Sequence, residues 1–296
     1  MPSPPDPGGA TAARQRALLA WSDGARRDLP WRRTRDPWAV LVSELMLQQT
    51  QVARVVSRWA TFLTRFPTPA ACAAGTVGDV VRAWHGLGYN RRAVNLHRCA
   101  VACVDLHGGR LPTTLPGLLA LPGVGPYTAR AVLAFAHEAD HGVVDTNAAR
   151  VLARAVAGRP LRPGPAQALA DALVPAGEAW AWNQAMIDLG ATVCAKRNPG
   201  CGACPWAELC EWARAGGEDP AVGSAGVGRL QSSFEGIDRQ GRGRLVAALR
   251  AGTVSGADLA AVAGWPDDPG RAWRVVAALM VDGLAESGAD GSVRLP

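Results

Sequence analysis

The sequence predicts an all-α protein that ends in a small α+β module, and three observations lead to this prediction. Apolar residues recur at spacings of three and four through most of the first 200 positions. Runs that alternate apolar and polar residues between turns, which would indicate strands, are scarce in that part. The end of the chain combines three helical patterns with two short alternating runs around a Gly-Ala-Asp-Gly turn.

The predicted elements follow one another with Pro and Gly between them. Residues 1–12 are rich in Pro, Gly and Ser and are expected to form a disordered tail, and an amphipathic pattern opens at residue 13. Helices are then expected over 38–49, 52–65, 77–84, 91–106, 115–121, 127–137, 146–157, 165–174 and 180–193. A linker of small residues follows over 215–240. The helices expected after it, 243–250, 255–263 and 269–283, together with the terminal hairpin, predict a winged-helix-like domain over 241–296.

The charge composition is unusual, because Lys196 is the only lysine among 31 basic residues. The net charge is +6, and the planar guanidinium of arginine grips phosphate in a bidentate way, so nucleic acid is an expected partner. A Schiff base needs an amine, so only Lys196 or the N-terminal amine could form one. The chain shows no apolar leader and no stretch long enough to cross a bilayer, and we expect a cytoplasmic, nucleoid-associated bacterial protein without membrane contact.

Four of the seven cysteines are close together in the sequence. Cys194, Cys201, Cys204 and Cys210 have the spacing C-x6-C-x2-C-x5-C in a loop rich in Pro and Gly. Four thiolates in such a loop can surround one iron-sulfur cluster. Zinc is the alternative, but its common pattern has two close pairs of ligands, and here only Cys201 and Cys204 form one. The remaining three are expected to be core thiols, namely Cys72, Cys99 and Cys103.

A glycine-rich turn lies between two predicted helices in LPGVGPYTAR, residues 121–130. Gly123 and Gly125 permit backbone conformations that other residues avoid, so that successive amides can point outward. The next helix begins at Pro126, and its positive end faces the same way. The pattern predicts a phosphate-binding corner; a plain interhelical turn is the alternative.

Asp145, in VVDTNAARV, stands between apolar residues and the start of a helix. An aspartate there is favoured as an N-cap, and the helix dipole keeps its carboxylate ionised. The same carboxylate can also face a cleft, so that capping and a catalytic role are compatible.

Glu44 lies in a helical stretch that is otherwise apolar, with Gln48 one turn later on the same face. Desolvation there is expected to raise the pKa of Glu44, as a general acid working near neutral pH requires. The alternative is a structural ion pair with one of the nearby arginines, Arg26, Arg27, Arg32, Arg33 or Arg35. Two carboxylates in different environments suit N-glycoside cleavage, in which one protonates the leaving group and the other stabilises a cationic sugar.

In combination these motifs resemble the helix-hairpin-helix glycosylase superfamily, the endonuclease III and MutY group. The hairpin LPGVGxxTA, the VDTN aspartate and the four-cysteine loop occur there in this order. Segment 29–51, with LVSELMLQQTQV, closely resembles the adenine-excising MutY branch. The resemblance spans about residues 14–212 and implies a six-helix domain that carries the hairpin, joined to a helical domain that holds a [4Fe-4S] cluster.

The resemblance implies a monofunctional glycosylase that removes adenine paired with 8-oxoguanine or guanine from double-stranded DNA. Glu44 would protonate adenine at N7 and later help to activate water. Asp145 would stabilise the sugar cation or form a transient adduct with it, and Tyr127 and Asn147 would position the acid and the sugar. Lyase members carry a lysine where this chain has Tyr127, so weak or no strand cleavage is expected.

The resemblance also implies the residues that contact DNA after the target base has left the stack. The positions that would wedge into the duplex and probe the opposing base are Gln49, Thr50, Leu87 and Tyr89. Those that would line the adenine pocket are Trp31, Arg32 and Gln184. Those of the phosphate-binding hairpin are Gly123, Val124 and Gly125. For Leu87 and Tyr89, ordinary packing is the alternative.

The resemblance implies the following domains. Residues 13–30 and 136–214 form the cluster domain, and residues 31–135 form the six-helix domain. The linker 215–240 and the winged-helix-like domain 241–296 follow, and the protein is expected to be a monomer.

The sequence departs from the family pattern at two places. Many members have a tyrosine at the position of Asn90, and only about 67 residues follow position 229, too few for the Nudix-like domain with which many members recognise 8-oxoguanine. The C-terminal end of the chain resembles a short-tailed variant of the family.

Two other functions compete with the adenine glycosylase. One is a thymine glycosylase for G:T mismatches, and the other is a DNA-binding module without catalysis.

Overall fold

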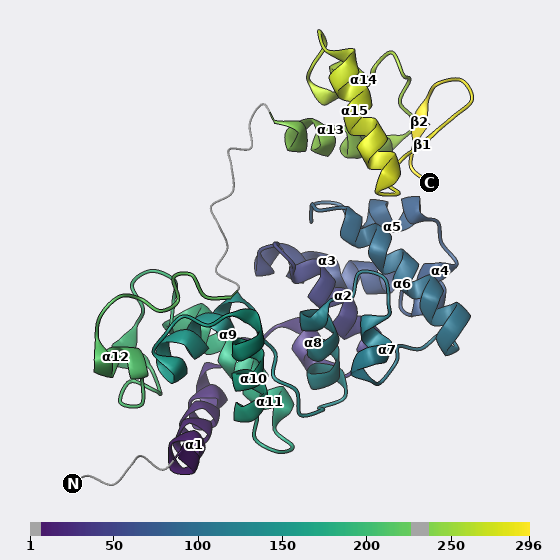
Figure 1. Ribbon diagram of the computed structural model, residues 1–296. Coiled ribbons are helices and arrows are strands. Elements are labelled where there is room, and N and C mark those ends of the chain that lie inside the picture. Colours follow the sequence, from purple (N-terminus) through teal and green to yellow (C-terminus); the bar gives the residue numbers. More distant parts are fainter. Residues whose placement is uncertain (1–6, 226–236) are drawn as a thin grey trace, which may run out of the picture. The chain divides into compact units, whose positions relative to one another are not determined.

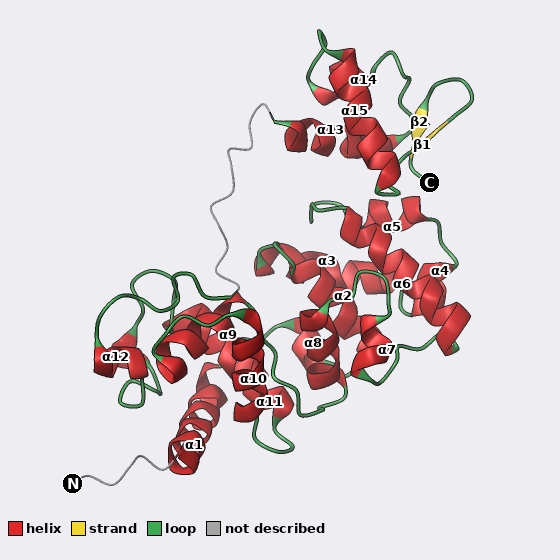
Figure 2. Cartoon of the chain, in the orientation of Figure 1, coloured by secondary structure: helices red, strands yellow, loops and turns green. Residues whose placement is uncertain are grey.

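The structure, a computed structural model, describes residues 7–225 and 237–296. Within these residues the chain is helical except for one short antiparallel pair, β1 (Glu286–Ser287) and β2 (Val293–Arg294), drawn in yellow in Figure 2. Val254 extends the pair through a bridge to Val293. The prediction of an all-α protein with a small α+β end is confirmed.

Two compact units divide the chain, and each is described by itself. The first comprises Met1–Val40, Thr113–Leu115 and Gly125–Leu230, and the second comprises Leu41–Pro112, Pro116–Val124 and Gln231–Pro296. The helix after the glycine turn therefore belongs with the first unit, whereas the sequence grouped it with residues 31–135.

The first unit contains ten helical elements among its described residues. They are α1 (Pro7–Ala25), η1 (Pro30–Arg33), α8 (Pro126–Ala136), α9 (Thr146–Val151), η2 (Leu152–Ala157), α10 (Pro163–Leu173), α11 (Ala179–Asp188), η3 (Leu189–Val193), η4 (Cys201–Ala203) and α12 (Glu211–Ala215) (Figure 1). Elements η2 and η3 are π-helical turns that continue α9 and α11 directly. Such turns widen a helix locally and occur often at functional sites.

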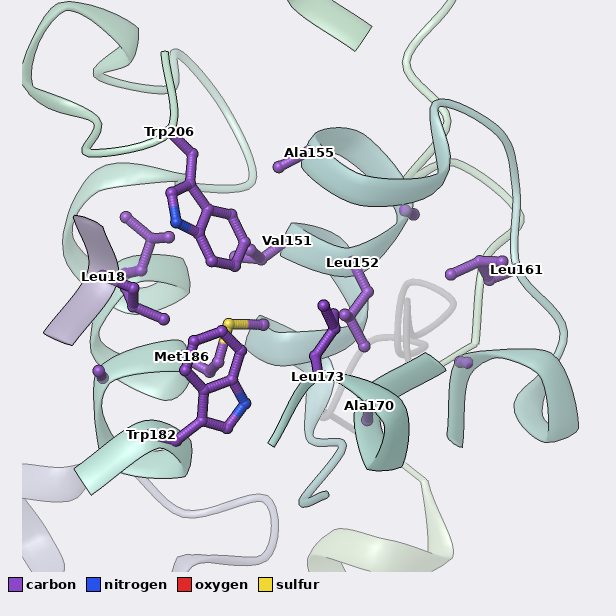
Figure 3. Packing of buried hydrophobic residues seen from close by; sticks show 14 residues of the cluster. Leu18, Val151, Leu152, Ala155, Leu161, Ala170, Leu173, Trp182, Met186 and Trp206 are labelled. Carbon is purple, nitrogen blue, oxygen red and sulfur yellow. The ribbon is translucent and has the colours of Figure 1, made fainter. Parts of the chain in front are cut away.

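The core of the first unit gathers around two tryptophans (Figure 3). The rings of Trp182 on α11 and Trp206 lie 6.0 Å apart, and both pack with Leu18 of α1. The indole N–H of Trp206 donates to the carbonyl oxygen of Arg14 at 2.9 Å. Trp206 follows the third cysteine of the loop, so this contact ties the loop to α1. Truncating such a buried tryptophan to alanine typically costs about 3–5 kcal/mol.

The second unit contains most of α2 (Pro37–Leu47) and α7 (Leu115–Leu119), which both begin in the first unit. Its other helices are α3 (Val52–Arg65), α4 (Pro69–Ala73), α5 (Val77–Ala83), α6 (Arg91–His107), α13 (Asp238–Ala251), α14 (Leu259–Ala263) and α15 (Pro269–Val281). The ring of Phe62 meets Trp84 edge to face at 5.9 Å. The short helix α4, capped by the Thr68 side chain, has no counterpart in the sequence prediction, because five residues give no readable periodicity.

Two boundaries correct the sequence prediction. Helix α1 begins at Pro7, so residues 7–12 are helical and not disordered; proline suits the first turn of a helix, and the alanines that follow favour its continuation. Helix α13 begins at Asp238, inside the expected linker, and an acidic residue in the first turn stabilises a helix. The rest of the expected tail, residues 1–6, and the middle of the linker, 226–236, lie outside the described residues. In the part of the chain that the structure describes, no helix is long and apolar enough to span a bilayer.

Candidate functional site

Asp145 is the N-cap of α9, as the sequence predicts. Its Oδ1 accepts hydrogen bonds from the amides of Asn147 and Ala148 at 2.9 and 2.7 Å. Its Oδ2 accepts from the side-chain amide of Asn147 at 2.8 Å. Burial raises the pKa of Asp145, while the hydrogen bonds from Ala148 and Asn147 lower it; burial has the larger effect.

Asn147 is itself held on two sides by residues that the sequence analysis missed. Its Oδ1 accepts from the guanidinium of Arg150 at 2.9 Å, and the same guanidinium donates to the carbonyl oxygen of Cys194 at 2.7 Å. A Cβ at Gly190, on η3, would lie 2.6 Å from the Cβ of Asn147, so that only glycine lets the two segments approach. The side-chain amide that bonds Asp145 is thus fixed in place.

The hairpin begins α8 with Pro126 in its first turn and half-buried Tyr127 after it. Gly123 has a φ of 77°, and a Cβ there would lie 2.5 Å from that of Asn95, which explains the glycine. Gly125, in contrast to the expectation, has a conformation open to any residue: it is the N-cap of α8 with an extended φ of −92°, and nothing lies near its Cβ position. Val124 is buried between them.

The three residues expected to line an adenine pocket lie in the first unit and are buried. Arg32 grips Asp188 with two parallel hydrogen bonds of 2.7 and 2.8 Å, one from each terminal nitrogen. Burial alone would raise the pKa of Asp188, but the hydrogen bonds and charge of Arg32 and the hydrogen bonds from Arg27 lower it below its usual value. Gln184 precedes Asp188 by one turn of α11. Asp188 therefore orients Arg32, a role that the sequence analysis missed, while Trp31 is buried beside it on η1.

Glu44 lies on α2, in the second unit, and only 4 % of it is exposed. This burial supplies the desolvation that its expected role as an acid requires. The arginines that the sequence offered as ion-pair partners of Glu44 form ion pairs within the first unit, and the ion-pair alternative for Glu44 stays open. The pairs are Arg26–Asp23, Arg27–Asp188, Arg32–Asp188, Arg33–Asp28 and Arg35–Glu138.

Two turns of the second unit carry the residues expected to contact the duplex. Gln49 lies two residues after the end of α2 and has a φ of 54°. Tyr89 follows the Gly-rich turn and has a φ of 45°. Both side chains are exposed, and both backbones are in the left-handed region that non-glycine residues rarely occupy. The hydroxyl of Thr50 donates to the carbonyl oxygen of Leu87 at 3.2 Å and joins the two turns. Leu87 is 3 % exposed, which favours the packing alternative for this residue in the free protein.

Arg92, a fourth residue that the sequence analysis missed, donates hydrogen bonds to both turns. Its Nη1 donates to the carbonyl oxygens of Leu45, Met46 and Gln48 at 2.6, 2.9 and 2.6 Å, which caps the end of α2. Its Nη2 donates to the Thr50 hydroxyl at 3.0 Å and to the carbonyl oxygens of Leu87 and Gly88, each at 3.1 Å. Burial lowers the pKa of Arg92 to about 10, which leaves it charged at neutral pH.

All four cysteines of the loop line one cavity of about 240 Å³ in the first unit. The other lining residues are mostly apolar and include Val151, Leu189, Val193 and Pro199. Among the residues that the structure describes, no three His, Cys, Asp or Glu side chains converge closely enough to hold a single metal ion. The four thiols therefore line one common space. The other three cysteines are buried in the second unit, which confirms them as core thiols.

Comparison with known proteins places these features in a family. Residues 42–175 match the HhH-GPD superfamily base excision DNA repair proteins. The chain is 45 % identical to the adenine DNA glycosylase of Mycolicibacterium smegmatis over 94 % of both chains. It is 41 % identical to the adenine DNA glycosylase of Homo sapiens over 66 % of this chain and 38 % of that protein.

Solved structures agree in fold. A thermostable thymine-DNA glycosylase matches with a TM-score of 0.65 and 28 % identity, over 70 % of this chain and 98 % of that one. An endonuclease III trapped on DNA matches with a TM-score of 0.60 and 22 % identity, over 69 % of this chain and 97 % of that one. This second likeness shows the fold alone. The chain belongs to the adenine DNA glycosylase family, within the HhH-GPD superfamily of base excision DNA repair proteins.

Proposed function

We propose that this protein hydrolyses the N-glycosidic bond of adenine mispaired with 8-oxoguanine or guanine in double-stranded DNA. The observation that carries the proposal is the 45 % identity, over 94 % of both chains, to a protein named adenine DNA glycosylase. The buried carboxyl of Glu44 and the capped carboxylate of Asp145 supply the acid and the anion that the reaction needs. We expect the protein to act as a monomer on chromosomal DNA, in the bacterial cytoplasm.

Glu44 donates a proton to N7 of the adenine, which makes the base a better leaving group, and then helps to activate water. Asp145 carries the negative charge that stabilises the developing cationic sugar, or forms a transient adduct with it. The Asn147 amide holds Oδ2 of Asp145, and the two main-chain amides hold Oδ1, so the carboxylate is oriented before substrate arrives. Tyr127 is proposed to position the reacting groups from the first turn of α8.

Recognition is assigned to three groups of residues. Trp31, Arg32 and Gln184 would accept the extruded adenine, with Arg32 oriented by Asp188. The hairpin amides around Gly123, Val124 and Gly125 would hold a phosphate at the start of α8. The residues that would fill and probe the duplex are Gln49, Thr50, Leu87 and Tyr89.

The test of function uses a panel of duplexes that carry adenine opposite 8-oxoguanine, guanine or cytosine, and thymine opposite guanine. We expect adenine release opposite 8-oxoguanine and guanine in single-turnover assays. Asp145→Asn and Glu44→Gln should each lower the rate by about 10²–10³-fold or more. Thymine release from G:T would favour the thymine glycosylase, and tight binding without release of any base would favour a module without catalysis. Wild-type rates in both variants would contradict the mechanism.

Base release without strand cleavage is the second part of this proposal. Lyase members carry the reacting amine at the hairpin position that Tyr127 occupies in this chain. Lys196 is exposed within the cysteine loop. A Schiff base therefore lacks a positioned amine. We expect little strand cleavage after adenine release, and efficient borohydride trapping that Lys196→Ala abolishes would contradict the assignment.

We also propose that Cys194, Cys201, Cys204 and Cys210 hold a [4Fe-4S] cluster. The common cavity that these cysteines line, its apolar walls and the C-x6-C-x2-C-x5-C spacing support a cluster over one zinc ion. When bound, the cluster supplies four iron–thiolate bonds that cross-link the loop, together with a redox couple. Arg154 donates to the Cys194 sulfur at 3.5 Å and would neutralise part of the cluster's charge.

Metal analysis tests the cluster separately from activity. Purified protein should contain about four iron atoms and absorb visible light. Cys204→Ser should lose iron, whereas the matched control Cys99→Ser, which changes a buried thiol of the second unit, should keep it. Stoichiometric zinc, or equal iron in the two variants, would contradict the proposal.

A further inference from the structure

The C-terminal module, residues 237–296, packs closely on the helical part of the second unit. The amide of Gly78, on α5, donates to the carbonyl oxygen of Pro296 at 2.7 Å, and a Cβ at Gly78 would lie 2.7 Å from that oxygen. Gly283, after α15, has a φ of 74°, and a Cβ there would lie 2.8 Å from the guanidinium of Arg98 on α6. Glycine on each side therefore permits the close approach of the module.

Asn90, the residue that departs from the family pattern, takes part in this packing. Its side-chain oxygen accepts from the guanidinium of Arg250, on α13, at 2.6 Å. Arg250 also donates to the carbonyl oxygen of Val81 at 3.0 Å. The module is thus anchored directly beside Tyr89, a residue expected to contact DNA.

A polar hollow of about 350 Å³ lies at this junction. The helical part contributes Gln48, Gln49, Tyr89 and Arg91, among others, and the module contributes Arg242 and Asp282. Side-chain amides, a phenol and guanidinium groups can all bond the edge of a base. The volume is in the range of a small-ligand site and exceeds what one base needs.

Inside the hollow, Asp282 joins two arginines from the two sides. Its Oδ2 lies 2.5 Å from Nη2 of Arg242 on α13, and its Oδ1 lies 3.3 Å from Nη1 of Arg91 on α6. The three groups form a row of donor, acceptor and donor. A carboxylate has about four acceptor positions, so Asp282 can accept further hydrogen bonds while it holds both arginines.

We propose that this row recognises 8-oxoguanine opposite the excised adenine, an inference that rests on the proposed function. One edge of 8-oxoguanine presents O6, the N7 proton and O8, which is acceptor, donor and acceptor, the complement of the row. Guanine has no N7 proton and no O8, and cytosine has neither group. Arg242 is then a specificity-determining residue that the module supplies, and Asp282 both orients it and accepts the N7 proton in a hydrogen bond.

The experiment measures binding, so that it does not depend on catalysis. The full chain is titrated into duplexes that carry a tetrahydrofuran abasic analogue opposite 8-oxoguanine, guanine or cytosine, at several fixed salt concentrations. Arg242→Ala, Arg242→Lys and Asp282→Asn are compared with Arg274→Ala, which removes an exposed arginine of the same module. Melting temperatures confirm that each variant is folded.

We expect Arg242→Ala to lose about tenfold in affinity opposite 8-oxoguanine and less than about twofold opposite cytosine. Arg242→Lys should lose most of the same preference, because a point charge cannot replace the fork. Asp282→Asn should reduce the preference for 8-oxoguanine over guanine, and Arg274→Ala should change nothing.

Equal losses opposite all three bases, with a shallower salt dependence, would mean a phosphate contact and would overturn the proposal. No loss in Arg242→Ala, or no 8-oxoguanine preference in the wild type, would overturn it as well. If the wild type binds with this preference yet releases no adenine, the proposed function fails and the inference on binding stands.

Discussion

The carboxylate of Asp145 and the turns that carry Gln49 and Tyr89 are positioned in opposite ways. Asp145 has ordinary extended backbone, and three hydrogen bonds from Asn147 and Ala148 hold its side chain. Gln49 and Tyr89 have strained, left-handed backbone, and Arg92 holds their turns from outside. The proposed catalytic carboxylate is therefore positioned by local sequence, whereas the turns proposed to face the duplex are positioned by long-range contacts.

The two regions also differ in the hydrogen-bond partners of the arginines that support them. Arg154, near the cysteine loop, is paired with the carboxylate of Asp219 at 2.8 and 2.5 Å. The hydrogen bonds of Arg92 run to carbonyl oxygens and a hydroxyl, and its guanidinium lies over the rings of Trp84 and Tyr89. A buried cation with neutral partners depends on every hydrogen bond. The turns that carry Gln49 and Tyr89 should therefore be the more fragile region.

The largest effect should come from Arg92→Ala. The substitution leaves carbonyl oxygens of α2 and of the Gly-rich turn without their donor, and it frees the two turns from each other. We expect the free energy of unfolding to fall by about 3–5 kcal/mol, measured by urea denaturation. Binding to duplex DNA should weaken with it.

Two variants control this result. Arg54→Ala removes an exposed arginine of α3 and should change stability by less than about 0.5 kcal/mol. Arg92→Lys keeps the charge but not the fork, so it should recover only part of the stability. If the free energy of unfolding of Arg92→Ala lies within about 1 kcal/mol of the wild-type value, the two turns keep their conformation without Arg92. The contrast between the two regions would then be lost.

A smaller and more specific effect should follow Asn147→Ala. The Asn147 amide bonds the ionised Asp145 and lowers its pKa, against burial, which raises it above 3.8. In the proposed mechanism catalysis needs the ionised form, so the excision rate should fall as the pH drops through this raised pKa. Removing the amide raises the pKa further, so the acid limb of the pH–rate profile should move to higher pH.

Thr146→Ala is the matched control, because it changes the neighbouring exposed side chain and leaves the Asp145 hydrogen bonds in place. Its acid limb should coincide with that of the wild type. An acid limb at lower pH in Asn147→Ala, or one unchanged, would show that the amide does not tune Asp145.

The sequence predicted the helices well wherever apolar periodicity was long and punctuated. Helix α3 has the predicted bounds 52–65, and α6 and α8 differ by one residue. The prediction failed at α2, which stops at Leu47 and not at residue 49, because Arg92 caps its carbonyls and Gln49 turns the chain back. No local pattern announces a cap that comes from 44 residues away.

In the candidate site, too, the features that could be predicted depend on residues close in sequence, and the others depend on distant ones. Asp145 as a cap and the four cysteines around one space were readable, because each depends on residues close in sequence. Asp188 and Arg92 were not, because their partners lie 156 and 44 residues away. Gly190 was a usable signal, since an isolated glycine inside a helical pattern often has a packing reason, and a Cβ there would lie 2.6 Å from that of Asn147.

The smallest expected effect is that of Gln49→Gly, and it is a gain in stability where Arg92→Ala is a loss. Gln49→Gly removes the cost of a left-handed backbone at a non-glycine residue, so it should raise the free energy of unfolding by about 0.5–1 kcal/mol, although glycine also makes the unfolded chain more flexible. The same change deletes a side chain that lines the polar hollow, so affinity for a duplex with 8-oxoguanine should fall. Gln49→Ala separates the two effects, because it deletes the side chain but keeps the strain. A stability loss in Gln49→Gly would mean that side-chain contacts of Gln49 outweigh the strain, and would place this turn with Asp145 among the locally stabilised parts of the site.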